Sequence, residues 1–138
     1  MSQSQNVVGA VETFEQSPKR RTVVENEDAV RDLLTVLNTS DCQDILDATS
    51  NEALSASEIS NRCGLPLSTT YRKLNLLADD GLLEERVRIS GAGKHVSEYV
   101  RIVDNVVISM SPEGTFELHI SQHEGPKSHT GFGFGMED

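Results

Sequence analysis

Residues 55–79 contain two helical patterns separated by only three residues, and this spacing restricts the fold more than any other feature of the sequence. Ser55 and Glu58 have the Ser-x-x-Glu spacing of a capping box, which predicts the start of a helix. Gly64 suits the left-handed position that ends a helix, and Pro66 is tolerated in the first turn of the next one. The sequence therefore predicts a helix, a tight turn and a second helix.

The second of these helices, expected over about 66–79, is amphipathic. At 100° per residue, its apolar side collects Leu67, Thr70, Leu74, Leu77 and Ala78. The opposite side collects Ser68, Arg72, Asn75 and Asp79, with Thr69 and Lys73 flanking it, and Tyr71 lies at the edge of the apolar side. We expect the apolar side to pack on a core, which leaves hydroxyl, amide and cationic groups facing outward.

Two earlier helices and two later hairpins complete the expected domain. Asn26 and the apolar spacing of residues 30–37 predict one helix, and residues 40–48 predict a shorter one. After Gly81 the apolar period changes from 3.6 to 2. Residues 82–103 are predicted to form a β-hairpin, in whose first strand Leu83, Val87 and Ile89 alternate with Glu84, Arg86 and Arg88. Residues 106–120 are predicted to form a second hairpin around a turn at 111–114.

This order of elements predicts an α+β fold, a winged helix-turn-helix with three to four helices, a β-hairpin wing and a second hairpin. The domain is expected over 25–120. Residues 1–24 are polar and aperiodic, which predicts a flexible N-terminal arm, and the Gly-rich residues 121–138 predict a disordered C-terminal tail. The chain lacks a secretory signal and a long apolar run, so we expect a cytoplasmic protein without a membrane segment.

The charge is unevenly distributed. The chain has a formal net charge of −10, which by itself disfavours a nucleic-acid partner. Residues 62–101, however, hold seven bases and five acids, a net +2, which leaves −12 for the rest. This asymmetry favours one surface that meets an anion. The acidic remainder is typical of a protein from a high-salt cytoplasm; the alternative is an acidic tail attached to an ordinary domain.

The outward residues of the second helix and the wing are the candidate DNA-binding site. A recognition helix over about 66–79 fits the major groove of double-stranded DNA, and a wing over about 82–103 reaches the backbone or the minor groove. The candidate DNA-binding residues are Ser68, Thr69, Tyr71, Arg72, Lys73, Asn75, Arg86, Arg88, Lys94 and His95.

Other site types have little support in the sequence. No catalytic triad or phosphate-binding motif is visible, so we expect no enzyme activity and no cofactor. The four histidines, at 95, 119, 123 and 129, match no compact zinc spacing, so no metal site is expected. Cys42 and Cys63 are interpreted as reduced, partly buried thiols, and a redox pair is the alternative.

The stretch from Leu54 to Ile102, "LSASEISNRCGLPLSTTYRKLNLLADDGLLEE…GKHVSEYVRI", resembles the winged helix-turn-helix transcription regulators of the ArsR and TrmB type, in particular haloarchaeal members. The resemblance covers roughly residues 28–103. It implies that Ser68, Thr69, Tyr71 and Arg72 face DNA. The Cys-x-Cys site of ArsR metal sensors is missing, and a second hairpin replaces the usual C-terminal helix.

The expected function is sequence-specific transcription regulation by a homodimer, with residues 106–120 and the first helix as candidate dimer contacts. The effector, if the protein has one, is not indicated by the sequence. The alternative is a winged helix used as a protein–protein interaction module in transcription or chromosome machinery, since the fold alone does not decide function.

Overall fold

The computed structural model describes residues 20–124, which contain four helices and six strands. The helices are α2 (Glu27–Leu37), α3 (Ser40–Ala48), α4 (Ala56–Cys63) and α5 (Leu67–Asp79). The strands are β2 (Arg20–Val24), β3 (Leu54–Ser55), β4 (Leu83–Ile89), β5 (His95–Arg101), β6 (Val103–Met110) and β7 (Phe116–Gln122). Within this range, no helix has the length and apolar character that crossing a membrane requires.

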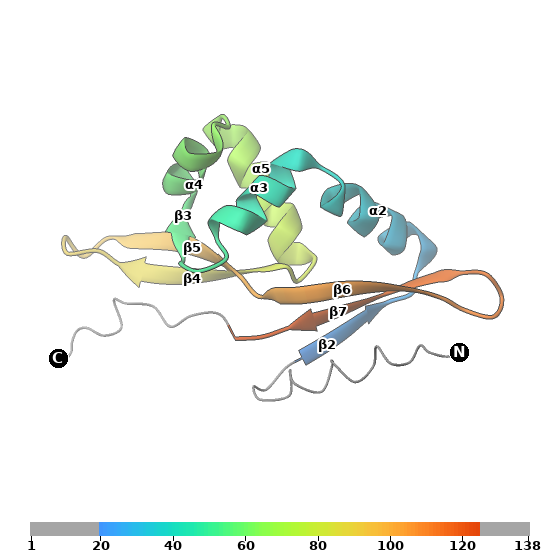
Figure 1. Cartoon of the computed structure of the whole chain (residues 1–138). Helices are drawn as coiled ribbons and strands as arrows, with labels where there is room; N and C mark the ends of the chain where they lie inside the picture. The colour runs from blue at the N-terminus through green and yellow to red at the C-terminus, as the bar shows by residue number, and fades with distance from the viewer. Residues whose placement is uncertain (1–19, 125–138) are drawn as a thin grey trace.

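The four helices form one layer, and two small antiparallel sheets lie beneath it (Figure 1). One sheet has the strand order β3-β5-β4 and contains the wing, while the other has the order β2-β7-β6. The turn between β4 and β5 and the turn between β6 and β7 point to opposite ends of the molecule (Figure 1). This α+β arrangement of helices followed by hairpins confirms the predicted winged helix-turn-helix fold.

A single core joins the helical layer to both sheets. Ile45, Ile59 and Leu74 from three helices are completely buried in it. Tyr99 of the first sheet and Leu118 of the second belong to the same cluster of buried side chains. The second hairpin is therefore part of the domain, because its inner face helps to bury the helices.

The predicted caps at Asn26, Ser55 and Gly64 are confirmed, whereas the capping box expected from Ser40 and Gln43 is absent, because α3 begins after Thr39 without a side-chain cap. The Ala29 N–H donates to Asn26 Oδ1 at 3.0 Å. The capping box is closed in both directions, since the Glu58 N–H donates to Ser55 Oγ at 3.2 Å and the Ser55 N–H donates to Glu58 Oε1 at 2.8 Å. Gly64 adopts the left-handed conformation at φ +67° directly after α4. These caps fix the angle at which the chain enters α5.

The structure differs from the predicted domain boundaries at both ends. Residues 20–24, expected to lie in a flexible arm, form strand β2, which pairs with β7 from Arg20 opposite Gln122 to Val24 opposite Leu118. The strand β7 likewise continues past the expected end of the domain to Gln122. The predicted arm at 1–19 and the predicted tail at 125–138 lie outside the described residues.

Candidate nucleic-acid interface

Helix α5 is held against the core by one side only. Thr70, Leu74 and Leu77 are completely buried. The Thr70 hydroxyl donates to the Pro66 carbonyl at 3.0 Å, so this buried polar group is satisfied within the helix. Leu67, predicted on the apolar side, is instead 44 % exposed, because it lies in the first turn, where α5 has only begun to meet its neighbours.

The opposite side of α5 presents the predicted recognition residues to solvent. Ser68, Tyr71, Arg72 and Asn75 are exposed, whereas Thr69 and Lys73 are partly buried beside them. Tyr71, which periodicity alone left at the edge, is 47 % exposed. Neither Arg72 nor Lys73 forms an ion pair with another residue in the range 20–124. Hydroxyl, amide and unpaired cationic groups therefore share one exposed helix surface.

The wing is a regular antiparallel pair in which Leu83 lies opposite Arg101 and Ile89 opposite His95. Side chains along a strand point alternately to the two faces of the sheet. Leu83 and its face neighbour Tyr99 pack into the core below the helices. Val87 and Ile89, on the same face, are 62 % and 61 % exposed, because the hairpin extends beyond the helices.

The two arginines of the wing are already paired with carboxylates. Arg86 contacts Glu84 at 3.1 Å, and Arg88 contacts the buried Glu98 at 2.7 Å. By the strand alternation, both lie on the face of the sheet opposite the core residues. A phosphate that bound Arg88 would have to compete with a buried carboxylate, so this arginine is better suited to holding the wing than to meeting DNA.

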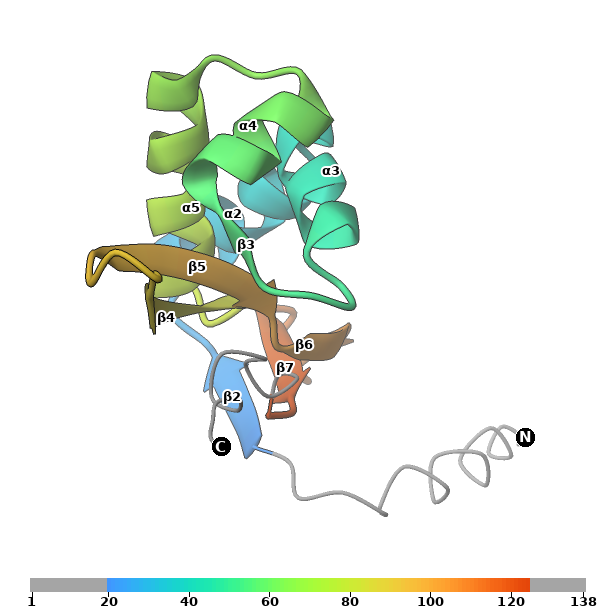
Figure 2. The same ribbon diagram turned by 90° about the vertical axis from the view of Figure 1, so that its left-hand side faces the viewer.

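The wing tip carries the remaining predicted cations. The Gly93 N–H donates to the Ser90 carbonyl at 2.9 Å, and the Ser90 N–H donates to the Lys94 carbonyl at 2.7 Å. This tight turn leaves the side chains of Lys94 and His95 exposed. Helix α5 and the tip of the β4–β5 hairpin lie on the same side of the molecule (Figure 2). The structure thus brings the α5 residues together with Lys94 and His95 but turns Arg86 and Arg88 away.

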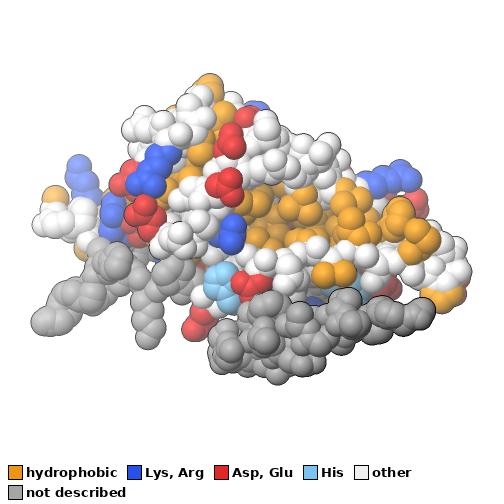
Figure 3. Space-filling model, in the orientation of Figure 1, with side chains coloured by type: hydrophobic (Ala, Val, Ile, Leu, Met, Phe, Trp, Pro, Cys, Tyr) orange, Lys and Arg blue, Asp and Glu red, His pale blue; other side chains and the backbone are white. Residues whose placement is uncertain are grey.

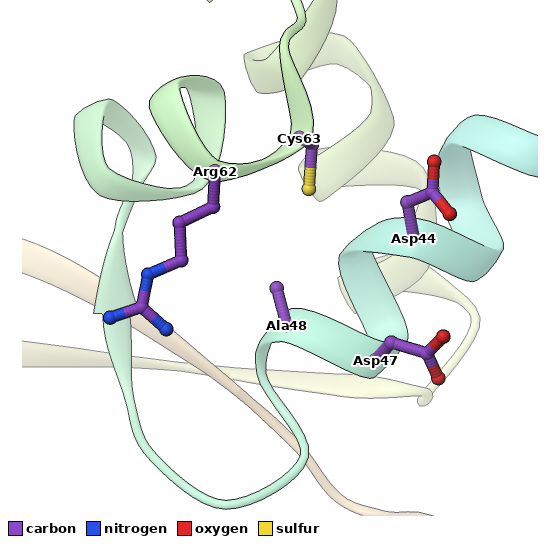
Figure 4. Close-up of a pocket in the computed structure, with 5 residues that line it drawn as sticks. All are labelled: Asp44, Asp47, Ala48, Arg62 and Cys63. Atoms are coloured by element: carbon purple, nitrogen blue, oxygen red, sulfur yellow. The ribbon is translucent and has the colours of Figure 1, made fainter.

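The two cysteines do not form a disulfide, and their surroundings disfavour thiolate chemistry. Cys42 is buried in the core, and this burial raises the pKa of its thiol. Cys63 faces an open pocket between α3 and α4 (Figure 4), whose other lining residues are Asp44, Asp47, Ala48 and Arg62. Partial burial, and then the charges of Asp44 and Asp41, raise the pKa of the Cys63 thiol. Both sulfur atoms are therefore held in the less reactive protonated form.

Histidines and acidic residues do not converge on a metal site in the described part of the chain. No group of three or more His, Cys, Asp or Glu residues there is arranged to hold a metal ion. His119 contacts Glu117 at 3.2 Å, and His123 contacts Asp104 at 2.5 Å, so each has a local carboxylate partner. His129 lies outside the described residues.

The sequence interpretation missed the exposed apolar surface of the wing. Val87 and Ile89 lie on the same face of the wing as His95. Alternation alone cannot separate a buried apolar face from one that continues into solvent.

Comparison with known protein families matches the region that contains α5 to a helix-turn-helix. Residues 36–86 match a family described as "Helix-turn-helix domain". The match begins at the end of α2 and includes α3, α4, α5 and the first half of β4. No curated protein matches the chain. Together, the match and the fold identify a helix-turn-helix unit of the kind found in DNA-binding regulators, followed by a β-hairpin wing.

Proposed function

We propose that this protein is a sequence-specific, double-stranded DNA-binding transcription regulator that acts as a homodimer. One observation carries the proposal: the helix that follows the turn is fixed by buried residues on one side and exposes hydroxyl, amide and unpaired cationic groups on the other. The matched helix-turn-helix family supports it, because its region contains this helix. We propose no catalytic role and no cofactor.

The chemistry of α5 suits the reading of base edges. Arg72 has the planar donor pair that matches guanine, and Asn75 has the amide that matches adenine. The hydroxyl of Ser68 donates to or accepts from either a base edge or a phosphate. With α5 in the major groove, Lys94 and His95 at the wing tip contact the backbone or the neighbouring minor groove.

The proposed homodimer sets the form of its DNA target. Two recognition helices in successive major grooves need half-sites about 34 Å apart, or a multiple of that spacing, so the target is a palindrome. The subtype is proposed to be ArsR- or TrmB-like, and the acidic composition suits the cytoplasm of a halophilic archaeon. We propose no effector.

The proposal is tested by selecting genomic fragments with the purified full-length chain in concentrated potassium chloride and then measuring binding by fluorescence anisotropy. We expect Arg72→Ala to weaken binding to the selected site by about tenfold to a hundredfold, as for loss of one base contact, and Lys73→Ala to weaken it less. Arg31→Ala is the matched control, because Arg31 is also an exposed helical arginine but pairs with Glu27 on α2.

Equal binding by wild type, Arg72→Ala and Arg31→Ala would contradict the proposal. The alternative, a winged helix that binds another protein, would then be the better explanation of the exposed α5 surface. A loss that is the same for α5 variants and for Arg31→Ala would show a general charge effect without sequence reading.

A further inference from the structure

The hairpin β6–β7 exposes three large apolar side chains at its outer end. Ile108, Met110 and Phe116 are 55 %, 63 % and 46 % exposed. The strand register places them on one face, since Ile108 lies opposite Leu118 and Met110 lies opposite Phe116. We call these three residues the hairpin-end surface.

The hairpin-end surface is the outward continuation of the core face of the sheet. Leu118, the cross-strand neighbour of Ile108, is completely buried, and so is Ile120 on the same face. The hairpin extends past α2, and its turn lies at the edge of the molecule (Figure 1). Apolar side chains run from beneath the helices towards that end (Figure 3). The face is thus built as an interior surface, of which residues 20–124 cover only the inner part.

The charge around this surface restricts what can cover it. No charged residue occurs from Asn105 to Pro112, in a chain whose net charge is −10, and the exposed Glu113 follows in the turn beyond the three apolar side chains. Glu117 lies opposite Ser109 on the other face of the hairpin, where it contacts His119. Nucleic acid would find no cation on this surface. Two copies of an acidic chain, by contrast, can approach each other with least repulsion where neither carries charge.

We infer that the hairpin-end surface is where a second copy of this chain packs, each copy placing Ile108, Met110 and Phe116 against the same three residues of the other. The inference rests on the homodimer of the proposed function and names its contact. A neutral apolar surface is self-complementary, as a two-fold interface requires. The hairpin end lies opposite the wing tip, so this contact leaves α5 and the wing of both copies accessible (Figure 1).

The test compares two substitutions on neighbouring residues of β6. Ile108 lies on the hairpin-end surface, while Val107 lies on the opposite face and is similarly exposed, at 52 %. Sedimentation equilibrium of the full chain in concentrated potassium chloride gives the dimer dissociation constant. We expect Ile108→Lys to raise this constant at least about tenfold and Val107→Lys to change it by less than about twofold. Met110→Lys should act as Ile108→Lys does, and circular dichroism should show that all three variants remain folded.

Three results would overturn the inference: a monomeric wild type, a dimer unchanged by Ile108→Lys and Met110→Lys, or a dimer disrupted equally by Val107→Lys. An unchanged dimer would also be the outcome if residues 125–138 of the same chain covered the surface. Binding to a single half-site duplex is measured in parallel. A monomer that still binds a half-site contradicts the dimer contact alone, whereas a dimer that binds no DNA contradicts the proposed function and supports the contact.

Discussion

At the scale of single residues, the side chains near Cys63 show how carboxylates raise the pKa of a thiol. Asp44, on the neighbouring helix α3, lines the same open pocket, and its charge disfavours a second negative charge on the sulfur atom. Arg62 acts in the opposite direction, but it also pairs with Glu52 at 3.0 Å. The raised pKa of the thiol therefore follows from burial first and from the nearby carboxylates second.

This environment predicts slow alkylation of Cys63. Only the thiolate reacts, so a raised pKa lowers the rate at pH 8 relative to an ordinary exposed cysteine, and the rate rises until the pH passes the raised pKa. Asp44→Asn should lower that pKa and speed the reaction at pH 8 without changing the plateau at high pH. Peptide mass spectrometry after iodoacetamide treatment separates Cys63 from Cys42.

The control for this experiment is Asp47→Asn. Asp47 lines the same pocket but does not contribute to the raised pKa of Cys63, so its substitution should leave the rate at pH 8 unchanged. A wild-type Cys63 that reacts faster than an exposed cysteine at pH 8 would contradict the protonated state and restore the redox interpretation of Cys42 and Cys63.

Residue roles were predictable where a periodicity or a cap determines them. The exposure of Ser68, Arg72 and Asn75 follows from helical spacing alone. The ion pair of Arg88 was not predictable, because it depends on the strand register that places Glu98 beside it, whereas Arg86 pairs with Glu84 only two residues away on the same strand. Charge counted along the chain cannot show which cations are neutralised by partners that are distant in sequence.

At the scale of elements, Gln122 connects the second sheet to the end of the recognition helix. Its side-chain Nε2 donates to the Gly81 carbonyl at 2.7 Å, and its Oε1 accepts from the Thr22 hydroxyl at 3.2 Å. Gln122 is 4 % exposed, so both contacts lie within the protein. The turn after α5 is thereby joined to β7 and β2.

Gly81→Ala should therefore destabilise the protein more than Gly64→Ala. Both glycines have positive φ, +80° and +67°, but a Cβ at position 81 would lie 2.6 Å from Gln122 Nε2, whereas one at position 64 would meet open space. The left-handed conformation costs an alanine about 1–2 kcal/mol at either position. Loss of the buried hydrogen bond adds about 1–3 kcal/mol at position 81. Urea denaturation at neutral pH measures both free energies of unfolding.

Equal destabilisation by the two substitutions would show that Gln122 does not restrain the turn. The strand β2, which supplies Thr22 to this contact, was missed because "RRTVV" is short and polar at its start, and its pairing with β7 joins residues about 100 positions apart. The helices were predictable from local signals, whereas such long-range pairing has no local pattern.

At the scale of the whole molecule, the two hairpins extend to opposite ends, one on the proposed DNA side and the other carrying the proposed dimer contact. The wing extends beside α5, and the β6–β7 hairpin extends to the other end with its neutral apolar face (Figure 1). On the proposed DNA side, Arg72, Lys73 and Lys94 form no ion pair with a described residue. In a strongly acidic chain, these cations distinguish that side from the hairpin-end surface.

This distribution predicts a shallow salt dependence of DNA binding. Each phosphate contact contributes about −0.9 to the slope of log K against log salt, so contacts from these three cations contribute about −3 per protomer, and repulsion by the acidic remainder does not add to it. Lys94→Ala should reduce the slope by about 1, whereas Arg31→Ala should leave it unchanged, because Arg31 lies on α2 in an ion pair with Glu27. Anisotropy titrations over a range of potassium chloride concentrations give all three slopes. A much steeper slope for the wild type would mean that Arg86 and Arg88 leave Glu84 and Glu98 to bind phosphate, so that the ion pairs of the wing are replaced when DNA binds.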